Sequence, residues 1–182
     1  MIKFEKSSII AAVYSDRDFE EALKNNVEVI ILLRANLLTL HKFIESAHKN
    51  QKMLFVHADM TEGITKDDFG IAYIAKAGAD GIVSTRSNLI KTAKKSKLMT
   101  VQRVFAIDSK SVSTAIETAK SCKPDMIEIM PGIIPKVIAR FKGNVNIPLI
   151  MGGFIETKEE IAQALSAGAH AVSTSRSELW NW

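Results

Sequence analysis

One segment of this chain is present in two copies. The stretch AGADGIVSTRSNL, residues 77–89, returns as AGAHAVSTSRSEL, residues 167–179, with an offset of 90 residues and no gap. The chain has 182 residues, so this offset is about half of its length. A sequence that repeats at half its length predicts a fold built from two similar halves.

Short apolar runs alternate with amphipathic segments along the chain. Between the runs, apolar residues recur every three or four positions, which indicates helices. Thr157, followed three residues later by Glu160, is a predicted capping box at the start of one helix, and Asp16 and Asp108 or Ser109 are predicted caps of two others. The apolar runs have the length and the aliphatic content of buried strands and cover residues 8–13, 28–33, 53–58, 80–85, 98–104, 125–130, 148–151 and 170–175.

Eight alternating strand–helix units favour a parallel sheet whose crossovers are helices. They predict an α/β protein, a small (β/α)8 TIM-type barrel with minimal loops, as a single domain over residues 1–182. A doubly wound open sheet is the alternative, because barrels of this type usually run to ~250 residues. The repeat favours the barrel, since two half-barrels related by a pseudo-twofold axis explain it and an open sheet does not.

The composition, with 47% hydrophobic and 24% charged residues, is that of a globular protein. The N-terminal sequence lacks the apolar core of a signal peptide, and no apolar segment reaches the ~20 residues that span a bilayer. The single cysteine, Cys122, excludes an internal disulfide and fits a reducing compartment, most simply as a buried apolar filler. We therefore expect a cytoplasmic protein with no membrane contact.

Glycines and hydroxyl residues follow the last two predicted strands. In TIM-type barrels, the loops after strands seven and eight often bind a phosphate group. Here Gly152 and Gly153 let backbone amides approach an anion closely, and the segment 173–175, Ser-Thr-Ser, closes strand eight and is predicted to open a helix. Separately, the glycines could be only a turn and the hydroxyls only a cap. Together, on adjacent strand ends, they predict a phosphate site.

The first half repeats this arrangement in part. With the gapless offset, Gly63 matches Gly153, while Glu62 stands where Gly152 is. A carboxylate there would repel phosphate, so the second copy is the better phosphate site. Arg86 would serve the other end of the ligand or pair with Glu62.

Polar residues inside predicted strands need partners, because burying them alone costs free energy. Alternation directs Glu128 into the barrel near its upper end, puts His57 and Asp59 on one face, and places Arg103 at the top of strand five. Asp59, Arg103 and Glu128 could bind ligand hydroxyls, perform acid–base chemistry, or neutralise one another. His57 and Asp59 could be a metal pair, although no third ligand is evident, so no metal site is predicted.

Basic residues gather on two predicted helices, and the net charge is +4. A solvated helix face explains such runs, and an RNA contact is the alternative. The candidate RNA-binding residues are Lys91, Lys94, Lys95, Lys136 and Arg140.

Several stretches resemble one known family, the glycerol uptake operon antiterminator regulatory proteins. They are DGIVSTRSNLI with VQRVFAIDS, KPDMIEIMPGIIP, PLIMGGFIETKEEI, AVSTSRSELW and FVHADMTEGI. The resemblance implies a regulator that responds to glycerol 3-phosphate, binds an mRNA leader and prevents premature termination of transcription of glycerol-metabolism genes. It implies no catalytic residues and no cofactor beyond this effector.

Carried onto this sequence, the resemblance implies two sets of ligand contacts. The phosphate would fall on Gly152, Gly153, Ser173, Thr174 and Ser175. The hydroxyls would approach Asp59, Arg103 and Glu128, with Arg86 and Gly132 nearby.

Other functions stay open at this point. A barrel with a phosphate site and an upper-rim Asp59 and Glu128 would also suit a phosphosugar isomerase, aldolase or lyase. A ligand-binding barrel whose output is a protein partner is a third option. A homo-oligomer is possible too, because Trp180 and Trp182 at the end of the chain could cover the barrel or form a dimer contact.

Overall fold

The eight apolar runs form eight strands in the computed structural model, which describes residues 8–182. The strands are β1 (Ile9–Val13), β2 (Val29–Leu32), β3 (Met53–His57), β4 (Gly81–Ser84), β5 (Met99–Phe105), β6 (Met126–Met130), β7 (Leu149–Gly152) and β8 (Ala171–Thr174). Each pairs in parallel with the next, and β8 pairs with β1, so the sheet closes into a barrel. The predicted (β/α)8 barrel is confirmed, and the open sheet is not found. Residues 1–7 of the predicted single domain lie outside the described residues.

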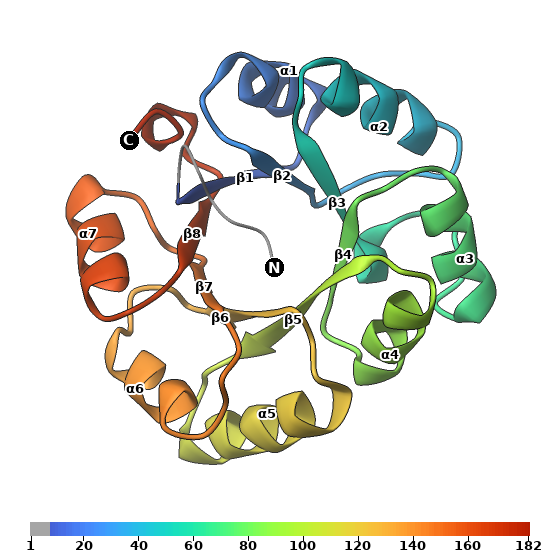
Figure 1. Ribbon diagram of the computed structural model, residues 1–182. Helices are drawn as coiled ribbons and strands as arrows, with labels where there is room; N and C mark the ends of the chain where they lie inside the picture. The colour runs from blue at the N-terminus through green and yellow to red at the C-terminus, as the bar shows by residue number, and fades with distance from the viewer. Residues whose placement is uncertain (1–7) are drawn as a thin grey trace.

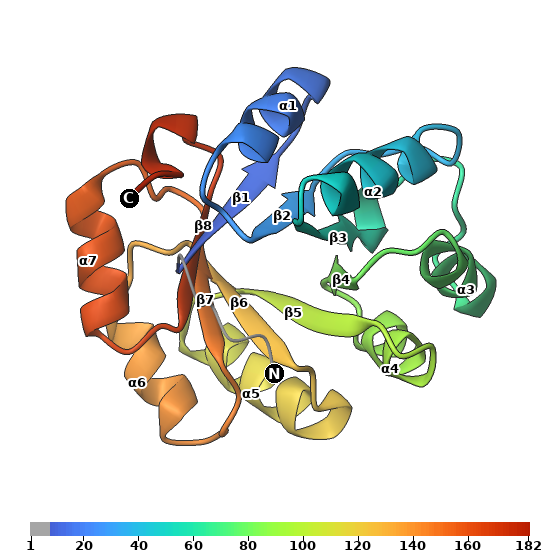
Figure 2. The same cartoon turned by 45° about the horizontal axis from the view of Figure 1, so that its top comes forward.

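Seven helices surround this barrel in the described part of the chain (Figure 1). They are α1 (Asp16–Lys24), α2 (Leu40–Lys49), α3 (Asp68–Lys76), α4 (Ser87–Lys95), α5 (Ser109–Cys122), α6 (Lys136–Lys142) and α7 (Lys158–Ser166). Figure 2 shows the same ring from an oblique angle, with each helix outside the sheet. Within residues 8–182, no helix is long and apolar enough to cross a lipid bilayer.

The strand side chains separate two apolar cores. Inward-facing residues such as Ile31, Phe55 and Ile150 fill the barrel interior. Outward-facing residues such as Ile30 and Ile127 pack with the helices in a larger outer core. Both faces of the sheet are therefore buried, which explains why the strands read as continuous apolar runs.

The helix starts follow their predicted caps, with one correction. Thr157 and Glu160 form the expected capping box of α7, and Asp108 caps α5 together with Ser111. Helix α1, in contrast, is capped by Ser15, whose hydroxyl accepts a hydrogen bond from the Asp18 amide, and Asp16 is its first residue. Serine and aspartate are both good N-caps, so the sequence alone does not show which of the neighbours Ser15 and Asp16 caps the helix.

The eighth helix expected after β8 is absent from the described residues. A three-residue 3-10 helix, η2 (Ser177–Leu179), stands in its place and leads to Trp180. Trp180 is fully buried in the outer core, and its indole N–H donates a 2.9 Å hydrogen bond to the Thr174 carbonyl. This tryptophan therefore covers the side of the barrel that a helix would have covered.

Strand register relates the two halves of the barrel, β1–α4 and β5–η2. His57 pairs with Val83 in the first half, and Gly152 pairs with Ser173 in the second. Val83 and Ser173 are equivalent in the sequence repeat, so His57 is the counterpart of Gly152. The gapless matching of Glu62 with Gly152 was therefore wrong.

An insertion explains this shift. The loop between β3 and α3 covers residues 58–67, whereas the loop between β7 and α7 covers only residues 153–157. The first half thus carries five additional residues, which place the 3-10 helix η1 (Ala58–Met60) directly after β3. Counting from the helices still matches Gly63 with Gly153, and both glycines have positive φ angles.

Candidate functional site

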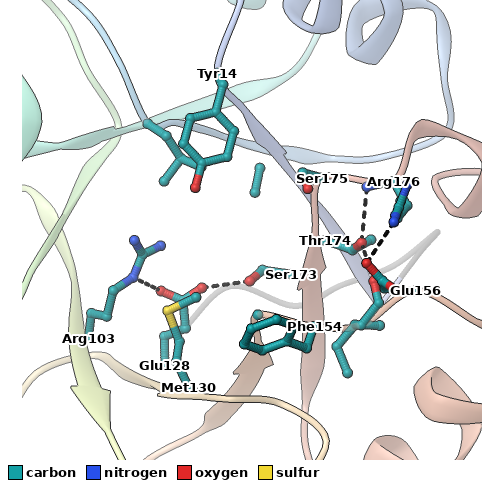
Figure 3. Close-up of a pocket in the computed structure, with 14 residues that line it drawn as sticks. Tyr14, Arg103, Glu128, Met130, Phe154, Glu156, Ser173, Thr174, Ser175 and Arg176 are labelled. Atoms are coloured by element: carbon teal, nitrogen blue, oxygen red, sulfur yellow. Dashed lines mark hydrogen bonds and ion pairs between the residues drawn. The ribbon is translucent and has the colours of Figure 1, made fainter.

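A pocket of about 110 Å3 opens at the carboxyl ends of the strands (Figure 3). This volume is far below the ~300–1,000 Å3 of pockets for drug-sized molecules, so it suits a small ligand. Its walls come from strands β1, β5, β6 and β8 and from the segments that follow β1, β2, β7 and β8. The lining residues are Ala12, Tyr14, Leu33, Arg103, Glu128, Met130, Gly153, Phe154, Ile155, Glu156, Ser173, Thr174, Ser175 and Arg176.

The floor of the pocket is a buried ionic network. The Arg103 Nε donates a 2.6 Å hydrogen bond to Glu128 Oε2, and the Ser173 hydroxyl donates a 2.6 Å bond to Oε1. Glu128 is fully buried, and Arg103 is 7% exposed. The two Nη groups of Arg103 have no hydrogen-bond acceptor within residues 8–182, and Figure 3 shows them directed toward the open side of the pocket. A guanidinium whose unused donors face a pocket is suited to an oxygen-rich ligand.

Gly152 makes room for this network. A Cβ at this position would lie 2.4 Å from Ser173 Oγ and 2.6 Å from Glu128 Oε1. Any larger residue would therefore displace the carboxylate or the hydroxyl. Gly152 acts beneath the pocket and does not line it.

The loop after β7 forms one wall of the pocket. Gly153 and Phe154 both have left-handed backbone conformations, with φ of 77° and 58°. This turn leaves the Phe154 ring 73% exposed at the pocket rim. Gly132 supports the loop from outside, where its amide donates to the Gly153 carbonyl at 2.9 Å. A Cβ on Gly132 would meet Ile155 at 2.9 Å, so this glycine allows close packing and does not reach the pocket.

The end of β8 and the segment after it lie beside this loop and form the adjoining wall. The Thr174 hydroxyl donates to the Ile155 carbonyl at 2.7 Å and accepts from the Arg176 amide at 3.1 Å. The Ser175 amide and hydroxyl, in contrast, donate to no acceptor in the described part of the chain. Arg176 Nη2 lies 2.6 Å from Glu156 Oε1, and this bond raises the pKa of the guanidinium above its ordinary value.

Four of the five predicted phosphate residues line this pocket, namely Gly153, Ser173, Thr174 and Ser175, and Gly152 lies below it. Arg103 and Glu128, from the predicted hydroxyl set, line it as well. Asp59, Arg86 and Gly132 do not. The structure thus brings the two strand-end groups together with the buried ion pair.

Sequence reasoning missed several lining residues. Tyr14 directs its hydroxyl toward the pocket from the end of β1 (Figure 3). An arginine directly follows the hydroxyl residues in both copies of the repeat, as Arg86 and as Arg176, and this recurrence was a usable signal. Met130 ends β6 on the same strand face as Glu128, so alternation could have found it. Phe154 and Glu156 lie in a loop whose path no sequence pattern specifies.

Asp59 has a different environment, at the end of β4. Its carboxylate accepts hydrogen bonds from the Ser84 hydroxyl at 2.9 Å, the Thr85 amide at 2.7 Å and the Thr85 hydroxyl at 3.2 Å. Arg86 Nε lies 3.5 Å from the same carboxylate. The pairing of Arg86 with Glu62 was therefore wrong, since Glu62 pairs with Arg34 at 3.6 Å.

His57 lies inside the barrel beneath Asp59. It is 4% exposed, and its Nδ1 is the one buried side-chain nitrogen or oxygen without a hydrogen-bond partner in the described residues. Burial, helped by the positive charge of Arg103, lowers the pKa of His57 to about 4. Over residues 8–182, no three histidine, cysteine, aspartate or glutamate residues lie close enough together to hold a metal ion.

The candidate RNA-binding residues are all exposed but divide into two groups along α5. Lys91 and Lys94 contact its carboxyl-terminal end, through the Ser121 hydroxyl and the Lys123 carbonyl, and Lys95 follows them on α4. Arg140 contacts Ser113 near its amino-terminal end, and Lys136 precedes it on α6. The 14 residues of α5 span about 20 Å, which separates the two groups.

The comparison with family models decides the family. Residues 9–180 match the model described as the glycerol-3-phosphate responsive antiterminator. The chain belongs to this family. The resemblance stated from the sequence motifs is therefore confirmed, and with it a regulatory class of protein.

Relatives agree over nearly the whole chain. The uncharacterised protein YgcP of Escherichia coli K12 is 30% identical over 176 residues, which cover 96% of this chain and 92% of YgcP. A solved glycerol uptake operon antiterminator regulatory protein from Listeria monocytogenes is 35% identical, with a TM-score of 0.94 and coverage of 98% and 97%. An antiterminator-related protein from Thermotoga maritima is 32% identical, with a TM-score of 0.86 and coverage of 96% and 98%.

Aldolases share the fold alone. The deoxyribose-phosphate aldolase of Aeropyrum pernix has a TM-score of 0.72 over 96% of this chain and 88% of its own, at 15% identity. Such similarity shows a common barrel and carries no information about chemistry.

Proposed function

We propose that this protein binds glycerol 3-phosphate in the pocket of Figure 3 and thereby controls transcription antitermination. The observation that carries the proposal is a small polar pocket, on the carboxyl-terminal face of the barrel, in a member of a glycerol-3-phosphate responsive family. The pocket offers cationic donors from Arg103 at its floor and hydroxyl donors from Ser175 at its β8 side. A triose-sized phosphate ester has the matching distribution of oxygens.

The proposed ligand orientation follows from the donors and acceptors in each part of the pocket. Phosphate belongs on the β7 and β8 loops, where Gly153 and Ser175 supply backbone and hydroxyl donors. The glycerol hydroxyls belong on the floor, where Arg103 has unused donors and Glu128 is a carboxylate acceptor. Asp59, Arg86 and Gly132 have no direct ligand contact in this orientation.

We propose that the protein, once it has bound glycerol 3-phosphate, binds an mRNA leader in the cytoplasm. This binding would prevent premature termination of transcription. Ligand control requires that glycerol 3-phosphate binds one conformation more tightly than another. Lys136 and Arg140 are better placed than the α4 lysines to respond, because they lie beside the start of α5 at the pocket end of the barrel.

Two measurements test this function. Isothermal titration with glycerol 3-phosphate, glycerol and glycerol 2-phosphate should give saturable binding of glycerol 3-phosphate and much weaker binding of glycerol. A gel shift with the leader RNA, at one stated salt concentration, should change when glycerol 3-phosphate is added. No binding of the phosphate ester, or an unchanged gel shift, would contradict the corresponding half of the proposal.

A phosphosugar enzyme is the second candidate, because Glu128 is a carboxylate at the pocket floor. The eight strands contain no lysine, so an aldolase that forms a Schiff base on a strand lysine is not supported. Glu128 also has both carboxylate oxygens engaged by Arg103 and Ser173. Turnover of triose or pentose phosphates that is lost in Glu128→Gln would establish the enzyme instead.

A further inference from the structure

The first half of the barrel already holds an anion at its strand end. The Asp59 carboxylate is bound by one backbone amide, two hydroxyls and one guanidinium, all from residues 84–86. Its side chain is 13% exposed, so solvent does not compete strongly for these donors. Charge-assisted hydrogen bonds of this kind are the strong ones in proteins.

The second half presents the same donors in the same turn. Ser84-Thr85-Arg86 corresponds in the repeat to Thr174-Ser175-Arg176. The local turn is conserved in geometry, because the Arg86 amide donates to Ser84 Oγ at 3.0 Å and the Arg176 amide donates to Thr174 Oγ1 at 3.1 Å. The donor groups that bind Asp59 therefore recur on Ser175 and Arg176.

The second half lacks the internal carboxylate. Asp59 lies within the five-residue insertion after β3, and the short loop after β7 has Gly153 and Phe154 in that region. The Ser175 amide and hydroxyl consequently have no protein acceptor among residues 8–182. Arg176 alone is engaged, by Glu156, and both of these side chains are about half exposed.

We infer that the ligand phosphate occupies, in the second half, the position that the Asp59 carboxylate occupies in the first. This inference rests on the proposed function and extends it to named atoms. The phosphate accepts hydrogen bonds from the Ser175 amide, the Ser175 hydroxyl and the Arg176 guanidinium. Asp59 fills the equivalent first-half position with a residue of the chain, which limits the barrel to one phosphate site.

Arg176 must exchange partners for this to happen. Its Glu156 contact lies at the pocket rim and is exposed, and such pairs contribute little to stability. A phosphate dianion brings more charge and more acceptor oxygens than Glu156 does. Ligand binding therefore releases Glu156 and pulls Arg176 toward the pocket, which changes the loop between β7 and α7.

The first test follows the backbone amides of Ser175 and Thr85 by NMR during titration with inorganic phosphate and with glycerol 3-phosphate. In the wild-type protein, the Ser175 amide should shift with saturation, and the Thr85 amide should not respond. In Asp59→Ala, both amides should respond, because the first-half position is then open. A folded Asp59→Ala protein whose Thr85 amide ignores phosphate would overturn the inference.

A matched pair of arginine variants gives the second test. Arg176→Gln should weaken glycerol 3-phosphate binding about tenfold or more, as expected when a charge-assisted contact is lost. Arg86→Gln, at the equivalent first-half position, should bind the ligand within about twofold of wild type. Equal affinities in the two variants would contradict the inference, and this test stands even where Asp59→Ala does not fold.

The outcomes separate the inference from the proposed function. Saturable binding that shifts Gly153 but leaves Ser175 unchanged would keep the proposed pocket and reject the named atoms. No saturable response of any pocket amide in wild type would reject the proposed function itself.

Discussion

The two halves of the barrel have the same strand-end turn but opposite surroundings. After β4, residues 84–86 surround a carboxylate of the chain, whereas after β8 the equivalent donors face a pocket. The difference follows from five inserted residues after β3, which carry Asp59 to the first-half turn. A single loop insertion therefore decides which half of a repeated fold is open to a ligand.

The two halves also differ inside the barrel, below the strand-end turns. Gly152 leaves space in which Glu128, Ser173 and Arg103 form a hydrogen-bonded network. Its first-half counterpart is His57, which fills the barrel interior as a buried ring. The half without this pocket is thus filled at two levels, by the His57 ring inside the barrel and by the Asp59 carboxylate above it.

The largest expected effect comes from the second-half network. Glu128→Leu would leave Arg103 buried without its partner, and breaking a buried ion pair on one side costs about 3–5 kcal/mol. Urea unfolding should show this loss in the free energy of unfolding. Glu128→Gln retains hydrogen-bonding oxygen and should lose less, so equal losses in the two variants would show that the charge at Glu128 is unimportant.

The next largest effect is expected from removing the Asp59 carboxylate in the first half of the barrel. Asp59→Ala leaves the Thr85 amide and two hydroxyls without their acceptor, which should lower the free energy of unfolding by about 2 kcal/mol. Phosphate should restore part of this loss by binding at the vacated donors. Thermal unfolding of Asp59→Ala with increasing phosphate tests this, and a melting temperature that rises no more than that of wild type would argue against it.

The buried ring of His57 should make the free energy of unfolding depend on pH, by an amount similar to or smaller than the loss in Asp59→Ala. Its folded pKa of about 4 lies below the ordinary 6.5, so the unfolded chain binds a proton more readily between these values. Stability due to the neutral ring is present above pH 6.5 and is lost as the pH falls toward 4, by about 2 kcal/mol between pH 7 and pH 5. His57→Gln should flatten this part of the pH profile measured by urea unfolding. An unchanged slope would contradict the assignment.

The smallest effect concerns the rim of the pocket. Glu156→Gln removes the competitor for Arg176, so glycerol 3-phosphate should bind several-fold more tightly, which corresponds to about 1 kcal/mol. Isothermal titration against wild type measures the change. Weaker binding in this variant would mean that Glu156 contacts the ligand favourably and that Arg176 does not exchange partners.

Sequence patterns were sufficient for the barrel and insufficient for its rim. The strands could be predicted because burial on both faces leaves continuous apolar runs, and the repeat specified closure. Gly153 and Ser175 were found because glycine and hydroxyl residues at late strand ends have a known use. Asp59 lies outside the pocket, because the residues inserted after β3 carry its carboxylate to the end of β4, and strand alternation could not show this insertion. Glu156 and Phe154 depend on a loop path that only packing determines.

We infer that the barrel has one anion site and that this site lies in the second half. A crystal structure of the protein with glycerol 3-phosphate tests this most directly. We predict one ligand, with its phosphate within hydrogen-bond distance of the Ser175 amide and Arg176 turned away from Glu156. A phosphate bound beside residues 84–86, or at the β8 turn with Arg176 still paired to Glu156, would contradict the claim.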